Sequence, residues 1–121
     1  MAFNESLAKR VRLCLGKENI AFEEKRMMGG LCFLVEAKMC LGVEKDRLMV
    51  RLDPAIYQEA LRRSGCTPMD FTGRPMRGFV WVESAAIKSA PALTRWVRLA
   101  LDFNPRAKAS KKAKGKPGSG R

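Results

Sequence analysis

The sequence predicts an α+β fold in which three helices accompany an antiparallel sheet of about four to six strands, in the order α-β-β-β(-β)-α-β(-β)-α. Three apolar runs, at 31–35, 39–43 and 48–52, each have about the length of a strand, and the charged breaks between them are short enough for hairpins. Apolar residues recur at helical spacing before and after these runs. We therefore expect a meander flanked by amphipathic helices.

The first helix is expected from about Asn4 to Gly16. The side chain of Asn4 can accept hydrogen bonds from the unpaired N–H groups of the first turn, which makes it a good N-cap. One stripe of this helix is apolar and consists of Leu7, Ala8, Val11, Cys14 and Leu15. Most basic residues lie off the stripe and are expected in solvent: Lys9, Arg10, Arg12 and Lys17.

The meander is entered through a charged segment at 23–26 and a corner at 27–30, where two glycines let the chain turn or bulge. A second, short helix is predicted to begin at Asp53 and Pro54, because a cap residue followed by proline is typical of a helix start. A serine–glycine pair at 64–65 is expected to end it.

The rest of the body is predicted to contain one or two strands and the last helix. The segment 66–77 is rich in turn residues and is expected to hold one irregular edge strand near 69–72, whereas 78–82 has the composition of a regular strand. Pro91 is expected to open the last helix and Pro105 to close it.

Two of the expected strands are apolar on both faces. A sheet with one wet face should alternate apolar and polar residues, but the runs at 31–35 and 79–82 do not alternate. One explanation is that a second copy of the chain, or another protein, covers the second face. The other is that the helices divide between the two faces of a monomer. The sequence leaves both open, with a slight preference for a homodimer.

No catalytic, metal or cofactor site is predicted. The chain has no histidine, which removes the commonest general base and metal ligand. The cysteines never occur in a Cys-x-x-Cys spacing, so they are expected to be reduced and buried: Cys14, Cys32, Cys40 and Cys66. The sequence favours a protein that is not an enzyme, and a nucleophile at Cys32 or Cys40 is the enzymatic alternative.

The chain is expected in the cytoplasm and not at a membrane. No apolar run approaches the roughly 18–20 residues of a membrane helix. The first residues lack the basic-then-apolar layout of a secretory signal.

The positive charge is concentrated at the C-terminus. Residues 1–104, with 17 basic and 12 acidic residues, carry +5, and residues 105–121 carry +7 without an acid. We therefore expect a folded domain at 1–104 and a disordered lysine-rich arm at 105–121. The arm suits the phosphate backbone of nucleic acid, and a purely solubilising role is the alternative. Its basic residues are Arg106, Lys108, Lys111, Lys112, Lys114, Lys116 and Arg121.

The corner and the strands after it resemble the N-terminal domain of the TfoX/Sxy family. The resemblance rests on 26–33 (Arg-Met-Met-Gly-Gly-Leu-Cys-Phe), on the strands 38–43 and 48–52, on the glycine-led strand 78–82 and on the Trp-Val pair at 96–97. It covers roughly residues 1–104 in order and spacing. The chain departs from the family pattern at Met28, where phenylalanine is usual, and at Ala37, where a glycine is common in the turn.

The resemblance implies a regulator and not an enzyme, because the namesake proteins are competence regulators that act as transcriptional co-activators. Those regulators look like two-domain proteins, with a C-terminal domain similar to helix-hairpin-helix DNA-binding modules. In this sequence the lysine-rich arm stands in the position of that second domain. The resemblance offers no catalytic position. The residues of the corner motif are expected to be structural: Met27, Met28, Gly29 and Gly30.

The leading hypothesis is a small non-enzymatic regulatory or nucleic-acid-associated module, a transcription co-regulator similar to competence regulators. Its body would contact protein and its arm would contact phosphate. The rival is a chaperone-like, dimeric protein-interaction domain whose basic arm only keeps it soluble. Sequence-specific recognition of DNA is not supported, because the chain lacks a helix-turn-helix signal and aromatic residues interleaved with basic ones.

Overall fold

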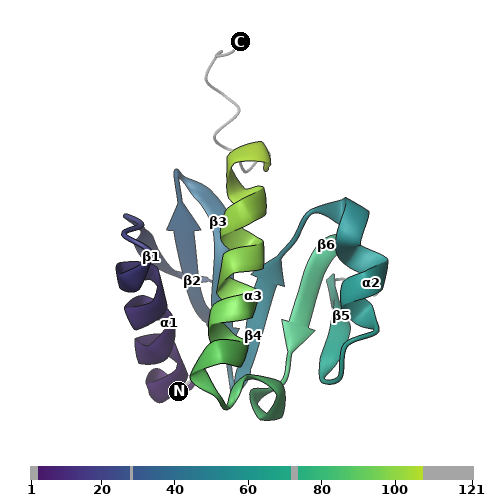
Figure 1. Cartoon of the computed structure of the whole chain (residues 1–121), viewed down its shortest axis with the longest axis horizontal. Coiled ribbons are helices and arrows are strands. Elements are labelled where there is room, and N and C mark those ends of the chain that lie inside the picture. The colour runs from purple at the N-terminus through teal and green to yellow at the C-terminus, as the bar shows by residue number, and fades with distance from the viewer. Residues whose placement is uncertain (1–2, 28, 72–73, 108–121) are drawn as a thin grey trace.

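The computed structural model describes residues 3–27, 29–71 and 74–107 (Figure 1). Within these residues the chain forms three α-helices and six strands, which confirms the predicted α+β class and element order. The helices are α1 (Glu5–Lys17), α2 (Tyr57–Leu61) and α3 (Ala90–Phe103). The strands are β1 (Glu23–Met27), β2 (Gly30–Val35), β3 (Lys38–Glu44), β4 (Arg47–Arg51), β5 (Cys66–Phe71) and β6 (Arg74–Val82). Short 3-10 turns are η1 (Pro54–Ile56), η2 (Ser84–Ile87) and η3 (Asn104–Arg106).

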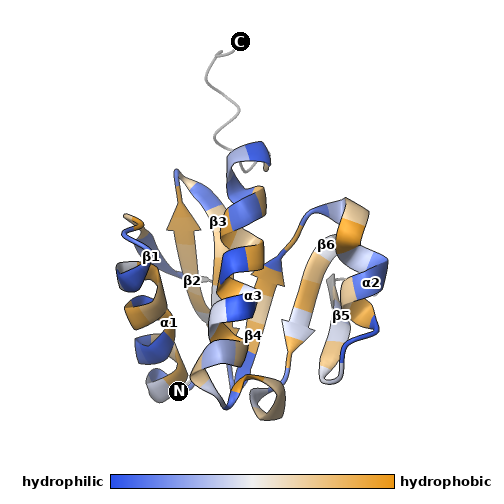
Figure 2. Ribbon diagram, viewed as in Figure 1, coloured by the Kyte–Doolittle hydropathy of each residue, from blue (hydrophilic) through white to orange (hydrophobic). Residues whose placement is uncertain are grey.

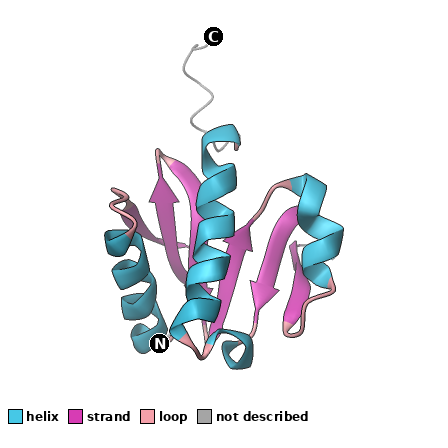
Figure 3. Cartoon of the chain, in the orientation of Figure 1, coloured by secondary structure: helices cyan, strands magenta, loops and turns pink. Residues whose placement is uncertain are grey.

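The strands form a single antiparallel sheet in the order β1-β2-β3-β4-β6-β5. The first four are the predicted meander, and each connects to the next through a short turn (Figure 3). Strand β6 then pairs with β4, with Met49 opposite Trp81, and β5 returns on the outside of β6. The sheet therefore joins residues from both halves of the chain at its centre.

The three helices lie on one side of the sheet, so the molecule has two layers (Figure 1). The core between the layers is built from alternate strand residues, among them Phe33, Leu41, Val50 and Val80, each fully buried. Apolar residues run along the central strands and along the inner stripes of the helices, whereas blue, hydrophilic residues mark the outer sides (Figure 2). The arrangement in which helices divide between both faces is therefore wrong, and the second face of the sheet carries no helix among the described residues.

The helix starts follow the predicted caps. The Oδ1 atom of Asn4 accepts from the N–H groups of Ser6 and Leu7 at 2.8 and 3.1 Å, and α1 begins at the next residue. Asp53 accepts from the N–H of Ala55 at 2.9 Å. The turn that follows Asp53 is 3-10, however, and only five residues of the expected second helix are α-helical. Pro54 is the first residue of this 3-10 turn, the position expected for a proline that opens a helix.

The two edges of the sheet differ from its centre. Strand β1 is one edge and consists of two glutamates, a lysine and an arginine before Met27. Strand β5 is the other edge. It starts at Cys66, earlier than the expected 69–72, and its pairing with β6 shifts register between Pro68 and Asp70. Proline is tolerated there because an edge strand leaves one row of backbone groups unpaired.

Across the described residues, no helix has the length and apolar character that crossing a membrane requires.

Candidate interaction surfaces

The glycines of the corner motif have a backbone role. Gly29 has a φ of +77°, a conformation that side chains rarely adopt. A Cβ atom on Gly30 would lie 2.3 Å from the carbonyl oxygen of Val43, which is too close for any side chain. These two residues let β2 start against the end of β3. Met28 and the side chain of Met27 lie outside the described residues.

The C-terminus of the body is fastened to the sheet at a junction formed by Asn104, Pro105 and Arg106. Asn104 is 3% exposed, and its Nδ2 donates to the carbonyl oxygen of Val35 at 3.1 Å. The ammonium group of Lys38 donates to the carbonyl oxygen of Pro105 at 3.5 Å. Both partners lie beside the β2–β3 turn, so the end of α3 is tied to that turn.

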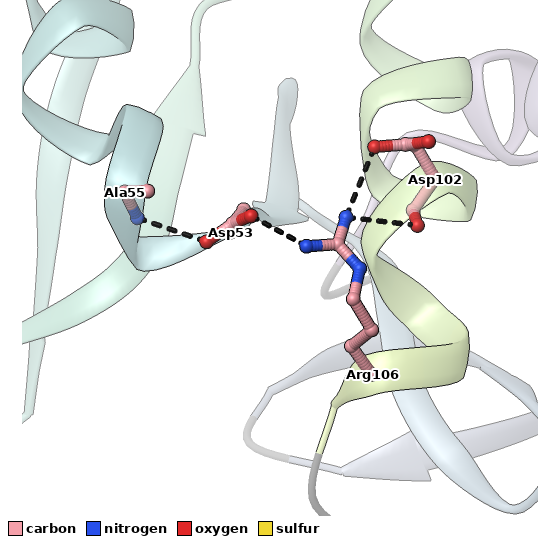
Figure 4. Close-up of polar contacts among 4 residues, drawn as sticks. All are labelled: Asp53, Ala55, Asp102 and Arg106. Atoms are coloured by element: carbon pink, nitrogen blue, oxygen red, sulfur yellow. Dashed lines mark hydrogen bonds and ion pairs between the residues drawn. The ribbon is translucent and has the colours of Figure 1, made fainter.

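Arg106 connects the junction to the loop before α2 (Figure 4). Its Nη1 atom donates to Oδ2 of Asp53 at 2.6 Å, and its Nη2 atom donates to Oδ2 and the carbonyl oxygen of Asp102 at 3.1 and 3.2 Å. The N–H of Ala55 and then Arg106 lower the pKa of Asp53, because both stabilise the carboxylate. The positive charge of Arg106 is thus already partnered within the body.

The predicted arm residues therefore fall into two groups. Arg106 is part of the described structure, and Ala107 after it is buried. The other six lie outside the described residues: Lys108, Lys111, Lys112, Lys114, Lys116 and Arg121. The division of the chain into 1–104 and 105–121 stays a prediction, with described structure extending to residue 107.

The basic residues of α1 are only partly available to a ligand. Arg10 donates to the carbonyl oxygens of Ile87 and Lys88 at 2.8 and 3.1 Å and so ties α1 to η2. Arg12 donates to both carboxylate oxygens of Glu24 on β1, at 2.5 and 3.1 Å. These two arginines brace the fold, contrary to the expectation that they are simply solvated.

The helix-free side of the sheet forms a second candidate surface, which we call the open face. It is defined by residues that alternate with the core positions of the four central strands: Cys32, Leu34, Gly42, Glu44, Arg47, Met49, Arg51, Phe79 and Trp81. Cys32, Gly42, Met49 and Trp81 form one row across the strands. This face is apolar at its floor and carries arginines above it.

Each arginine of the open face lies over an aromatic ring of β6. The Cζ atom of Arg47 is 3.8 Å from the ring centroid of Trp81, and that of Arg51 is 5.2 Å from the centroid of Phe79. Glu44 accepts from Nε and Nη2 of Arg47 at 3.0 and 2.6 Å. The Nη1 atom of Arg51 donates to the carbonyl oxygen of Met39 at 3.4 Å.

Three of the four cysteines, Cys32, Cys40 and Cys66, are buried thiols with a raised pKa. All four are free thiols, and Cys32 lies opposite Gly42, whereas Cys40 has no direct partner because the register shifts beside it. Burial raises the pKa of Cys32, that of Cys40 to about 12 and that of Cys66 to about 11. Such thiols stay protonated at neutral pH, and a protonated thiol is a poor nucleophile.

The sequence analysis expected an apolar second face but missed the arginine–aromatic pairs on it, because the members of each pair are distant in the chain. Arg47 and Trp81 meet only because β6 pairs with β4, which no local pattern specifies. The available signal was the alternation Arg47, Met49, Arg51 between buried residues, which places an arginine pair on one face of a strand. Basic and aromatic residues do not alternate along the sequence, but they lie beside one another across the paired strands β4 and β6.

A comparison with protein families gives one match. The model of the TfoX N-terminal domain matches residues 19–104, which run from the end of α1 to the start of the junction. We found no significant match between this chain and a curated protein or a solved structure. The match contains the corner, the whole sheet, α2 and α3. It covers well over half of the chain, and the chain therefore belongs to the TfoX N-terminal domain family.

Proposed function

We propose that this protein is a small non-enzymatic regulatory module that associates with nucleic acid, a transcription co-regulator similar to competence regulators. The main support is the charge after residue 104, where seven basic residues occur without an acid. This basic segment follows a domain of the TfoX N-terminal family. An arm of this composition binds phosphate by charge and has no means of reading bases.

The chemistry of the body supports a binding role. Catalysis by cysteine needs a thiolate, and the buried thiols of Cys32 and Cys40 have a raised pKa. The remaining common nucleophile activator, histidine, does not occur in the sequence. We therefore assign the function to surfaces that bind other molecules and not to a group that reacts with a substrate.

The junction sets how many charges the arm contributes. Arg106 is held by Asp53 and Asp102, so six basic residues remain for phosphate. Each neutralised phosphate adds about 0.9 to the log–log salt slope of duplex binding, which limits the contribution of the arm to roughly 5. A value near 3 is expected, because a segment with six scattered charges rarely places all of them on phosphates at once.

The test is a titration of duplex DNA at several salt concentrations. In the arm variant, the six basic residues at 108, 111, 112, 114, 116 and 121 are changed to glutamine. In the matched control, six exposed basic residues of the body are changed in the same way: Lys9, Lys17, Lys45, Arg62, Lys88 and Arg95. Both variants have the same net charge. We expect the arm variant to lose most of the slope and the control to keep most of it.

Equal loss in both variants would show that only net charge matters, and an unchanged arm variant would show that the arm is a solubiliser. Either result contradicts the proposal.

The rival function, a dimeric protein-interaction domain, is favoured by one observation. Tryptophan and arginine are enriched at protein interfaces, and the open face places Arg47 and Trp81 together. Analytical ultracentrifugation of the wild-type protein and of Trp81→Ala distinguishes this case, because a dimer formed through the open face dissociates in the variant.

A further inference from the structure

We infer that the open face binds single-stranded nucleic acid, with bases stacked on the arginine–aromatic pairs of β4 and β6. This inference deepens the proposed function, since it assumes association with nucleic acid. It assigns a second site with a different ligand preference, on the body and apart from the arm. Unlike the arm, this site would prefer single strands over duplexes.

Arg47 provides a preorganised stacking platform. Its guanidinium group lies on the ring of Trp81 at 3.8 Å, and two hydrogen bonds to one oxygen of Glu44 fix the orientation of its plane. The side chain of Arg47 remains 39% exposed. A planar guanidinium that lies on an aromatic ring and is partly exposed is a group on which a nucleic-acid base can stack.

Arg51 repeats the arrangement further along the same strand. It lies directly opposite Phe79 in the register, and its guanidinium is over that ring. Arg51 lies four positions after Arg47 in an extended strand, which places the two residues about 13 Å apart. The same strand therefore offers two stacking positions in one line.

The floor between the platforms is low and apolar. Met49 is 3% exposed and lies between the two arginines on β4, beside Gly42. A Cβ atom on Gly42 would lie 3.3 Å from Cε of Met49, so the glycine leaves the floor without a projecting side chain. Cys32 continues the row and is 5% exposed. Met49 and Cys32 are almost fully covered by neighbouring atoms, so a base would contact the arginine–aromatic pairs and not this floor.

A second copy of the chain fits this face less well. Each copy carries +12, and a two-fold contact would bring the arginines of β4 toward those of the partner. A polyanion avoids this difficulty.

The shape of the ligand favours a single strand over a duplex. The two strands at the centre of the face, β4 and β6, contribute two arginines and two aromatic rings, and Glu44 on the neighbouring strand β3 already accepts from Arg47. Stacking therefore carries the recognition, and a single strand supplies the exposed planar bases that the platforms need. In a duplex the bases are stacked on one another and unavailable, so this face would gain nothing from duplex DNA.

Tryptophan fluorescence tests the contact directly in the full chain, with an oligothymidylate as the probe. Trp96→Phe leaves Trp81 as the reporter, and we expect the oligonucleotide to quench its emission. Trp81→Phe leaves Trp96, which is 4% exposed in the core, and we expect no quenching. Equal quenching of both variants, or of neither, would overturn the inference.

Affinity for the same oligonucleotide, measured by fluorescence anisotropy, gives the second test. Trp81→Ala changes no charge, and the loss of a stacking platform should weaken binding about tenfold. The matched control is Leu13→Ala, which truncates a 61% exposed residue on the helix side and should change binding less than twofold. Arg47→Lys keeps the charge but removes the planar group and should weaken binding several-fold, whereas Arg95→Lys on α3 should not.

The outcomes separate this inference from the proposed function. The arm variant should lose affinity for duplex DNA and still show quenching of Trp81 by the single strand. If duplex binding proves independent of the arm while Trp81 is quenched, the proposed function of the arm fails and the open face stands. Three results would overturn the inference. Trp81→Ala could weaken duplex and single-strand binding equally, or it could dissociate a dimer. An acidic polypeptide could also quench Trp81 as well as the oligonucleotide does. Arg47→Lys provides an independent result should Trp81→Ala fail to fold.

Discussion

The β2–β3 turn contains an unfavourable residue, and replacing it should stabilise the protein. Val35 pairs with Lys38, so the turn has two central residues, Glu36 and Ala37, with φ values of 55° and 65°. Positive φ at both positions is the pattern of a type I′ hairpin, where glycine is preferred at the second. Both residues bear the strain of a left-handed conformation, in which the Cβ atom lies too close to the backbone, and Ala37 is at the position where glycine is preferred.

The expected gain follows from two opposing terms. The left-handed conformation costs a residue with a side chain about 1–2 kcal/mol, and Ala37→Gly removes that cost. Glycine also raises the conformational entropy of the unfolded chain, which lowers the free energy of unfolding by about 0.4–1 kcal/mol. Ala37 is exposed, so the change sacrifices no packing. The net increase in the free energy of unfolding should be about 0.5–1 kcal/mol, or about 2–6 °C in the melting temperature.

Urea unfolding followed by circular dichroism measures this difference. The slope against urea should stay constant and the midpoint should rise. Ala85→Gly is the matched control, because Ala85 is exposed in η2 and is not among the described residues with positive φ. That change should cost about 0.5–1 kcal/mol. If Ala37→Gly lowers the midpoint as the control does, the assigned turn strain is wrong.

Three further predictions concern the core and the junction. Gly30→Ala should destabilise the protein by about 2–3 kcal/mol, because its Cβ atom would meet the backbone of β3, whereas Gly16→Ala, which meets nothing within 4 Å, should be neutral or stabilising in urea unfolding. Asn104→Ala should cost about 1–3 kcal/mol in the same assay, since it leaves a buried carbonyl group without its donor, and a cost no larger than that of an exposed substitution would contradict the anchoring role. Burial raises the pKa of Cys40 from 9.0 to about 12 in the folded state. The stability that comes from burying the neutral thiol is therefore complete below the unfolded pKa of 9.0 and is lost as the pH rises toward 12. Urea midpoints measured between pH 7.5 and 10.5 should fall more steeply for wild type than for Cys40→Ala.

The sequence predicted what depends on neighbours in the chain. The cap at Asn4 and the proline-led start after Asp53 need only a few adjacent residues, and both are present in the structure. The glycine pair at 29–30 was recognised because its backbone requirement is local. These features follow from short-range geometry, which a sequence pattern records directly.

The remaining features depend on contacts between distant segments. Arg106 was assigned to the arm from composition, yet Asp53 draws it into the body across a large separation in the chain. The pairing of Arg47 with Trp81 needs the order of strands in the sheet, and no periodicity specifies that order. Because functional surfaces are built from such distant pairs, the fold was easier to predict than the candidate site.

The composition of the two outer strands has a consequence for how the protein behaves when concentrated. A free sheet edge is a template on which another chain can add a strand, and such addition leads to fibrils. Strand β1 opposes it with four consecutive charged residues, and β5 opposes it with Pro68 and a shifted register. Lateral growth of the sheet is thereby blocked at both ends. The sheet therefore exposes one face without offering an edge on which further strands readily add.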